Sequence, residues 1–390
     1  MHLVSLALGV IHVSICSRQD PSAKKVSFSI DSEHHDIFDF DESHKGGSHR
    51  NYQIPRPIRM KPLRKKVSKL IRKGTAEGAG GEEASSSGGF LPLSSGKVFF
   101  STLEIRPGRK FEVPVVGEVD VTDVLYEEAD DSRIYRATSV KSGEDLVIKI
   151  QFGSDASSFT ELDNEVEALK ALHACRGVVR LIAAPAETFV SRKGKTFKYC
   201  VLEALGRSLQ QLVLEEYPRG DMPIEKISLI ALKGIGALEE VHAAGYIHGD
   251  IGLGNILFTD SGETSIKLID FGYSRRYMDK KGNHVLPAGD NPLRKGERIT
   301  PLSISEIDGH FPSRRDDLHR LGEVLLKLLN SNYARLLDKS RNIRDTKMGV
   351  KPSRDCRDDA KKLDDYFTVV MELKYHDTPD YAKLRELFAI

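Results

Sequence analysis

The most constraining feature of this 390-residue chain lies between Tyr246 and Tyr273, where three polar residues stand at a characteristic spacing. Asp250 is followed five residues later by Asn255, and Asp270, which opens an Asp-Phe-Gly triplet, comes twenty residues after Asp250. In-line phosphoryl transfer needs a carboxylate to orient the acceptor hydroxyl and ligands that hold magnesium against a nucleotide's phosphates. We therefore assign the first role to Asp250 and metal binding to Asn255 and Asp270.

Two short apolar runs carry these residues. Residues 256–258 and 266–269 are predicted strands, joined by a turn at residues 259–263. This arrangement places both metal ligands at strand ends that face one cleft. The alternative is that the Asp-Phe-Gly triplet occurs here by chance, because the triplet alone is frequent.

The N-terminus is predicted to be a secretory signal peptide, residues 1–17. Leu3 to Ile15 is an apolar run of about thirteen residues, too short to span a bilayer, and the polar sequence after Cys16 suits signal-peptidase cleavage. A buried N-terminal strand is the alternative, because little positive charge precedes the run. A net charge of +1 excludes no class of partner. The other cysteines are too few and too scattered for a disulfide framework: Cys175, Cys200 and Cys356.

Residues 18–96 are predicted to be a disordered, basic and low-complexity segment, because no hydrophobic periodicity is sustained there. Within it, residues 56–73 contain nine Lys or Arg and no acidic residue. The apolar positions of residues 63–73 fall on one helical face, which is typical of a basic amphipathic helix able to lie on an anionic membrane. A solvated linker and a processed pro-segment are the alternatives.

The folded region is expected to begin near Lys97. Predicted strands cover residues 98–103, 111–116, 134–138 and 146–151, and a helix is predicted at residues 159–172. Lys149 on the last strand is expected to reach the α- and β-phosphates, held by an ion pair with Glu165, sixteen residues further on. Glu165 is preferred over Glu161 and Glu167 because its apolar neighbours at helical spacing point inward.

A connection between two lobes is predicted after the buried strand at residues 199–202. Residues 203–206 would present backbone groups to an adenine ring there. Leu202 would then be the gatekeeper residue at the back of the nucleotide site.

Residues from about 120 to 390 resemble eukaryotic protein kinases, and in particular the casein kinase I and vaccinia-related kinase group. Three segments carry the resemblance: Leu205–Leu209 after the connection, Ser313–Gly322 where the aspartate of a central C-lobe helix belongs, and Thr378–Phe388 at the C-terminus. An Ala-Pro-Glu triplet is absent. The group resembled also lacks it and has a Ser-Ile-containing segment, which here is Ser303–Glu306.

The resemblance implies an α+β, bilobal fold over residues 97–390, with a small β-rich N-lobe at about 97–202 and a larger, mostly helical C-lobe at about 206–390. It implies ATP and Mg²⁺ (or Mn²⁺) as cofactors and a protein as substrate or scaffold partner, with no nucleic acid expected. The catalytic residues that it implies are Asp250, Lys149 and Glu165. The nucleotide-binding residues that it implies are Lys149, Leu202, Glu203, Leu205, Leu257, Asn255 and Asp270, with Asn255 and Asp270 as metal ligands.

The chain departs from that family where a glycine-rich loop is expected. The three glycine positions are occupied by Glu127, Ala129 and Ser132, so the backbone lacks the freedom that glycine gives it to fold onto phosphates. Four carboxylates lie nearby, on residues 127, 128, 130 and 131. One carboxylate held ~6 Å from a phosphate charge at an effective dielectric constant of about 20 would cost roughly 3 kcal/mol. These carboxylates must therefore point away, recruit a cation or abolish binding.

The catalytic loop departs from the family as well. Gly249 replaces the arginine of His-Arg-Asp, so an activating phosphate would have no partner there. Gly252 and Gly254 occupy the positions where a Lys or Arg usually neutralises the transferring phosphoryl group, and charge stabilisation dominates that transition state.

Three functions are compatible with these features. The first is a secreted, ATP-dependent protein Ser/Thr kinase with an atypical glycine loop. The second is a pseudokinase scaffold, which the absent loop and the absent loop cation favour. The third is a small-molecule phosphotransferase of the aminoglycoside or choline kinase type, which shares the His-Gly-Asp triplet, but Ser313–Asp317 speaks against it. The signal-like N-terminus and the missing loop are also similar to secreted apicomplexan kinases and pseudokinases.

Overall fold

The computed structural model of the chain describes residues 107–389, with gaps at 109, 129–131, 155, 191–194, 219, 260–261, 280, 286–301, 331–332, 334–336, 338–339 and 341. Several predictions lie outside the described residues. These are the signal peptide at 1–17, the low-complexity segment at 18–96 with its basic helix at 63–73, and the strand at 98–103.

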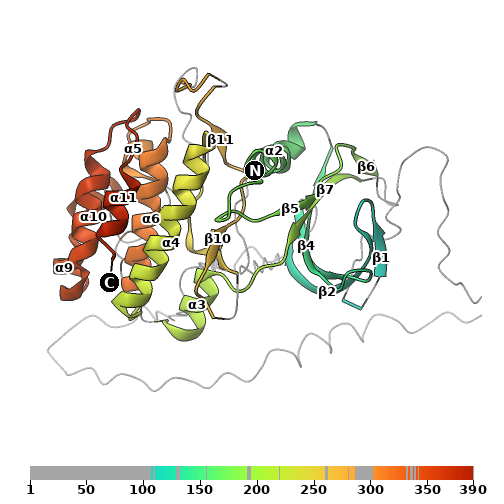
Figure 1. Cartoon of the computed structure of the whole chain (residues 1–390), viewed down its shortest axis with the longest axis horizontal. Coiled ribbons are helices and arrows are strands. Elements are labelled where there is room, and N and C mark those ends of the chain that lie inside the picture. Colours follow the sequence, from blue (N-terminus) through green and yellow to red (C-terminus); the bar gives the residue numbers. More distant parts are fainter. Residues whose placement is uncertain are drawn as a thin grey trace, which may run out of the picture. The chain divides into compact units, whose positions relative to one another are not determined.

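The N-lobe is built on a seven-stranded antiparallel sheet in the order β1-β2-β3-β4-β7-β5, with β6 also paired to β7 (Figure 1). Its strands are β1 (Lys110–Val113), β2 (Gly117–Glu127), β3 (Ser132–Ser139), β4 (Asp145–Gly153), β5 (Leu181–Ala183), β6 (Phe189–Val190) and β7 (Thr196–Glu203).

The start of this sheet differs from the sequence prediction. The strand predicted at 111–116 ends at Val113, because Val115 adopts a left-handed conformation (φ 76°) in a tight turn. The chain then returns as β2, an eleven-residue strand that was not predicted. Hydrophobic alternation in β2 is weak, since Thr122 and Asp123 interrupt it at a register shift.

Strand β4 places its alternate side chains on two faces, as the two-residue period of a strand requires. Leu146, Ile148 and Ile150 are buried in the hydrophobic core of the N-lobe. Lys149, which lies between them, therefore points to the opposite face.

One long helix, α2 (Thr160–Ala171), follows a short 3₁₀ helix at Ala156–Phe159. Leu162, Glu165 and Leu169 are buried, at the spacing of a single helical face. The predicted helix and its inward-facing Glu165 are thus confirmed.

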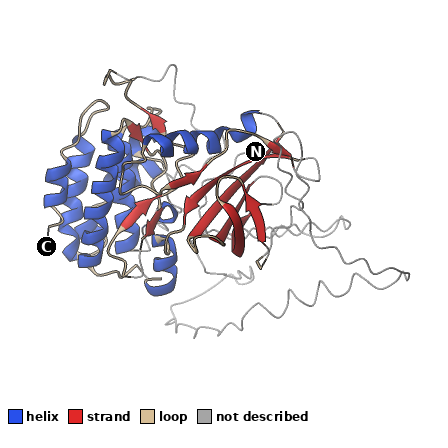
Figure 2. Cartoon of the chain, turned by 45° about the vertical axis from the view of Figure 1, so that its right-hand side comes forward, coloured by secondary structure: helices blue, strands red, loops and turns tan. Residues whose placement is uncertain are grey.

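The C-lobe is mostly helical, and Figure 2 shows its helices (blue) gathered on one side and the N-lobe strands (red) on the other. Its helices are α3 (Leu209–Glu216), α4 (Ile224–Ala243), α5 (Ile304–Ile307), α6 (Arg314–Leu329), α8 (Ile343–Gly349), α9 (Pro352–Asp355), α10 (Lys361–Glu372) and α11 (Tyr381–Glu386). Its short strands form two antiparallel pairs: β8 (Tyr246–Ile247) with β11 (Arg275–Arg276), and β9 (Ile256–Phe258) with β10 (Ile266–Leu268). The predicted α+β, two-lobed architecture is confirmed.

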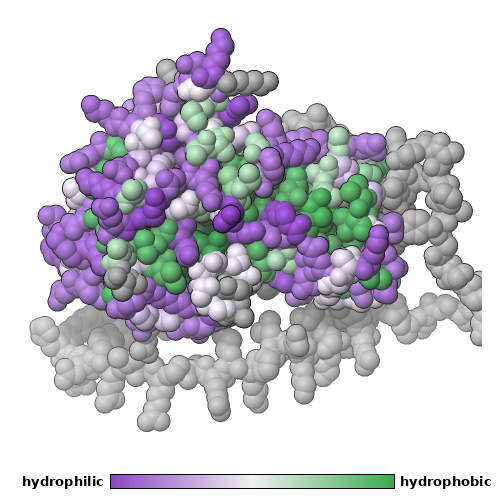
Figure 3. Space-filling view, in the orientation of Figure 1, coloured by the Kyte–Doolittle hydropathy of each residue, from purple (hydrophilic) through white to green (hydrophobic). Residues whose placement is uncertain are grey.

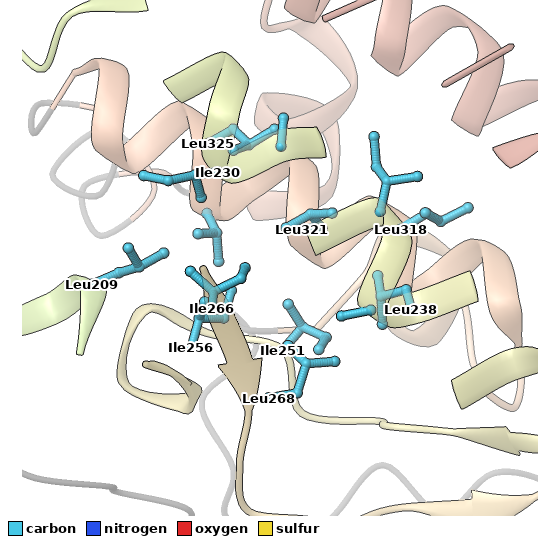
Figure 4. Packing of buried hydrophobic residues seen from close by; sticks show 14 of the residues in the cluster. Leu209, Ile230, Leu238, Ile251, Ile256, Ile266, Leu268, Leu318, Leu321 and Leu325 are labelled. Carbon is cyan, nitrogen blue, oxygen red and sulfur yellow. The ribbon is translucent and has the colours of Figure 1, made fainter. Parts of the chain in front are cut away.

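The core of the C-lobe packs directly behind the predicted site. Figure 4 shows Ile251, Ile256 and Leu268, each one or two residues from a site residue, gathered with leucines of α4 and α6. Burial of each such side chain stabilises the fold by about 1.5–3 kcal/mol. The polar residues next to them are therefore held on a rigid base.

The surface seen in Figure 3 is mostly hydrophilic (purple) over the C-lobe helices and carries hydrophobic residues (green) over the N-lobe around β5 and β7. Among the described residues, none of the helices has the length and apolar character needed to cross a bilayer. Cys175, Cys200 and Cys356 all remain free thiols.

Candidate active site

Lys149 joins the two lobes at the predicted site. Its Nζ lies 2.7 Å from Glu165 Oε2 on α2 and 3.1 Å from Asp270 Oδ1. The expected ion pair with Glu165 is therefore formed, and Lys149 also contacts the aspartate of the Asp-Phe-Gly triplet. The Glu165 side chain is only 1% exposed and that of Lys149 is 21% exposed, so the carboxylate of the pair is shielded from water.

The two carboxylates keep Lys149 charged. Burial alone would lower the pKa of Lys149, but Asp270 and Glu165 outweigh it and hold that pKa well above its ordinary value. A cation at this position is suited to phosphate oxygens.

Asp317 of α6 binds the backbone of the catalytic loop, which we define as residues 246–255. Its Oδ2 accepts the backbone N–H of His248 at 2.7 Å, and its Oδ1 accepts that of Gly249 at 2.9 Å. His242 of α4 lies 2.9 Å from the same carboxylate. Burial alone would raise the pKa of Asp317, but these partners lower it below its ordinary value. Asp317, in the Ser313–Gly322 segment, thus fixes the loop backbone.

His248 connects the catalytic loop to the Asp-Phe-Gly segment. Its Nε2 donates to the carbonyl of Ile269 at 3.0 Å, while its Nδ1 accepts the N–H of Asp250 at 3.2 Å. Its ring also packs on Phe271, with 4.5 Å between ring centroids. The two halves of the motif are therefore locked to each other.

The three residues that define the motif in sequence, Asp250, Asn255 and Asp270, lie next to these contacts of His248. Asn255 Nδ2 donates to Asp250 Oδ2 and to the Asp250 carbonyl, each at 2.9 Å. Asp270 adopts a left-handed backbone (φ 63°), a conformation that costs a non-glycine residue of order 1–3 kcal/mol and that clusters at functional sites. Asp250 and Asn255 are thus hydrogen-bonded to each other, and Ile269 N donates to the Asn255 backbone carbonyl at 3.0 Å, which brings the residue before Asp270 next to them.

This donor set fits a magnesium ion that is shared with a nucleotide. Asn255 donates its amide nitrogen to Asp250, and its amide oxygen and the Asp270 carboxylate are the kinds of oxygen atom that suit Mg²⁺. Mg²⁺ usually takes one or two protein ligands and completes its shell with water and phosphate oxygens. Within the described residues, no group of three or more His, Cys, Asp or Glu is placed to hold a metal ion.

The other predicted nucleotide-binding residues lie on two elements: Leu202, Glu203 and Leu205 at the end of β7 and in the connection between the lobes, and Leu257 on β9. Leu202, Leu205 and Leu257 are buried apolar side chains. Glu203 pairs with Lys267, and its Oε1 accepts the N–H of Arg180 at 2.6 Å, so it is fixed by the protein. Arg136 on β3 donates to the Leu205 carbonyl at 2.9 Å, which ties the sheet to the connection.

A hairpin of β2 and β3 occupies the place of a glycine-rich loop. Strands β2 and β3 meet there, and Glu128 N donates to Ser132 O at 2.9 Å. Glu127 pairs with Arg133 at 3.1 Å, and Glu128 accepts the Tyr126 hydroxyl at 2.8 Å. Two of the four carboxylates that could repel a nucleotide, those of Glu127 and Glu128, thus have partners within the protein. The other two, at 130 and 131, lie outside the described residues.

Two of the three glycines of the catalytic loop, Gly249 and Gly252, differ in their surroundings. Gly249 is left-handed (φ 75°), and a Cβ there would lie 2.7 Å from the Tyr273 carbonyl oxygen. Gly252 is extended (φ −156°), and a Cβ there would meet nothing within 4 Å. Gly249 is thus required by the backbone, whereas position 252 has room for a side chain.

Sequence reasoning missed one residue of the site, Arg320 on α6. Its Nη1 lies 3.5 Å from Asp250 Oδ1, and its other guanidinium nitrogens bind Glu306 of α5. The signal was present in the sequence, because Arg320 follows Asp317 by three residues and so shares its helical face.

Comparison with known proteins agrees with the fold and the site. More than half of the chain, residues 130–333, matches the protein kinase domain family, so the chain belongs to that family. It is similar to the bovine (Bos taurus) protein named serine/threonine-protein kinase VRK3, with 28% identity over 206 residues. The matched region is 48% of this chain and 44% of that relative's length. The resemblance to the casein kinase I and vaccinia-related kinase group is thereby confirmed. The similarity to secreted apicomplexan kinases stays a prediction.

Proposed function

We propose that the protein is an ATP-dependent protein Ser/Thr kinase. The proposal rests on the contacts that join Lys149 to Glu165 and to Asp270. It also rests on the hydrogen bond between Asn255 and Asp250. A scaffold has no chemical need for the complete polar set. The name of the bovine relative, serine/threonine-protein kinase VRK3, points to the same class of acceptor.

In the proposed reaction, Asp250 accepts the hydrogen bond of a Ser or Thr hydroxyl and takes its proton as the oxygen attacks the γ-phosphorus. The new oxygen–phosphorus bond forms as the bond to the leaving nucleoside diphosphate breaks. Lys149 orients the α- and β-phosphates, and Glu165 holds Lys149 in place. Magnesium held by Asn255 and Asp270 would supply charge neutralisation at the phosphates.

Calorimetry on the full chain, with and without Mg²⁺ or Mn²⁺, tests the binding half of this proposal. We expect metal-dependent ATP binding that Asp270→Ala weakens by about tenfold or more, since a metal ligand is lost. An absence of binding at millimolar ATP with either metal would support the second candidate, a pseudokinase scaffold. The β2–β3 hairpin, which carries Glu127 and Ser132 at two of the three glycine positions, is the observation that favours this candidate.

We also propose that the protein enters the secretory pathway and that residues 63–73 contact anionic membranes. The motivation is the apolar run at residues 3–15 and the basic amphipathic pattern. N-terminal sequencing of the native protein should give a start near Arg18, and recovery of Met1 would contradict secretion.

The full chain should bind anionic vesicles, and Leu70→Glu should weaken binding by removing apolar burial. Equal binding by the variant would leave electrostatics alone as the cause.

A further inference from the structure

A buried guanidinium stands beside Asp250, although the catalytic loop contains no cation of its own at 249, 252 or 254. Arg320 Nη1 lies 3.5 Å from Asp250 Oδ1, with the Arg320 side chain 3% exposed and that of Asp250 18% exposed. The other oxygen, Oδ2, accepts from Asn255. Both oxygens of the catalytic carboxylate therefore face a fixed group of the protein.

The other side of Arg320 is bound to the segment that follows the Asp-Phe-Gly triplet. Its Nε and Nη2 donate to Glu306 Oε2 at 3.1 and 2.9 Å, and Nη2 also reaches Oε1 at 2.8 Å. Glu306 is itself fixed, because Ser303 N donates to its Oε2 at 2.9 Å in a capping box at the start of α5. Arg320 thus bridges α5 and the catalytic loop.

The position of Arg320 is set by α6. Asp317, one helical turn earlier on the same face, binds the backbone of the catalytic loop. Leu318 and Leu321, on either side of Arg320 in sequence, are buried in the core that Figure 4 shows. Rotation of the helix would remove these leucines from the core, so the guanidinium is held in place.

Carboxylates surround Arg320 and maintain its charge. Burial alone would lower the pKa of Arg320, but Glu306 and then Asp250 raise it above its ordinary value. One guanidinium with five donors can serve both partners, because its planar fork addresses two carboxylates at once.

We propose that Arg320 is a positioning residue for phosphoryl transfer, which holds the Asp250 carboxylate toward the acceptor and couples that orientation to Glu306 in α5. The proposal rests on the proposed kinase function. It gives the chain a way to order its catalytic carboxylate without a phosphate on the activation segment, which Gly249 could not bind. A misplacement of about 1 Å at a reacting group can lower the rate about a hundredfold.

The test uses a paired substitution, because Arg320→Met alone would leave Glu306 as a buried and unpaired charge. Arg320→Met/Glu306→Gln removes both charges, and Gln still satisfies the capping box. We expect this variant to fold, to bind ATP within about twofold of wild type and to lose about a hundredfold in kcat. Arg320→Lys, which keeps the charge, should retain more of kcat than the paired variant.

A second buried ion pair of α6 provides the matched control. Lys347 Nζ lies 2.6 Å from Glu323 Oε1, with the two side chains 1% and 5% exposed. Lys347→Met/Glu323→Gln removes a comparable pair that does not include Asp250, and it should leave kcat unchanged. Equal losses of kcat in the two paired variants would show that Arg320 contributes only to packing and does not position Asp250.

The outcomes separate this inference from the function on which it rests. If wild type transfers phosphate and Arg320→Met/Glu306→Gln transfers it at the same rate, the role of Arg320 is wrong and the kinase function stands. If wild type transfers none, the kinase function fails and the proposed role of Arg320 fails with it.

Discussion

A Cβ atom at Gly249 would lie 2.7 Å from the carbonyl oxygen of Tyr273, and Gly249 has a φ of 75°. The residue that replaces the usual arginine of the catalytic loop is thus enclosed by the backbone that follows the Asp-Phe-Gly triplet. Restoring an arginine would require this backbone to move.

The first prediction compares Gly249 with Gly252, another glycine of the catalytic loop. Gly249→Ala should destabilise the protein by at least about 1–2 kcal/mol, the cost of a left-handed L-residue, before any cost of the close contact. Gly252→Ala, at an extended and open position, should stay within about 0.5 kcal/mol of wild type. Urea unfolding measures both. Equal stabilities would show that the backbone at 249 adapts to a side chain.

The open space at Gly252 allows the missing loop cation to be restored. Gly252→Lys should raise kcat on the order of tenfold, because a positive charge would stabilise the transferring phosphoryl group. Gly252→Met, of similar length and no charge, is the control and should leave kcat near wild type. A lower kcat for the lysine variant than for the methionine variant would contradict this prediction.

Asp317 should make the stability of the protein depend on pH. Folding lowers its pKa, so the unfolded state binds more protons in acid, and the stabilisation is lost as pH falls. Asp317→Asn should cost about 2 kcal/mol above about pH 4, and this difference should shrink as pH falls through the lowered pKa of folded Asp317. Asp365→Asn, at a side chain that is 47% exposed, should show no comparable difference. A difference for Asp317→Asn that is constant down to the acid transition would contradict the account.

The Lys149 ion pair can be tested with a double-mutant cycle. Lys149→Met leaves Glu165 buried and unpaired, so it should cost about 3–5 kcal/mol. Lys149→Met/Glu165→Gln should recover part of this loss, because no buried charge is then left without a partner on α2. Chemical unfolding gives the coupling energy. Additive effects would mean that the two side chains do not stabilise each other in solution.

The local motifs of this chain could be predicted from sequence because their spacing is set by chemistry. Residue type and separation predict five site residues, and the structure brings them together: Lys149, Glu165, Asp250, Asn255 and Asp270. Helix α2 and strand β4 were also evident from their apolar periods.

The features that sequence did not reveal depend on contacts between distant parts of the chain. Arg320 reaches Asp250 across 70 positions in sequence, and its spacing from Asp317 shows a shared helical face but not that its guanidinium contacts Asp250. The pairing of Glu127 with Arg133 likewise depends on the register of the β2–β3 hairpin. Strand β2 was missed because a register shift interrupts its alternation.

The most direct test of the central claim is transfer of the radiolabelled γ-phosphate of ATP to a generic acceptor protein, measured for the full-length wild type and for Asp250→Asn. We expect wild type to phosphorylate Ser or Thr in the presence of Mg²⁺ or Mn²⁺. Asp250→Asn should lose at least about a hundredfold in rate, while its affinity for ATP stays near wild type. An inactive wild type with both metals, or equal rates for the two proteins, would contradict the account.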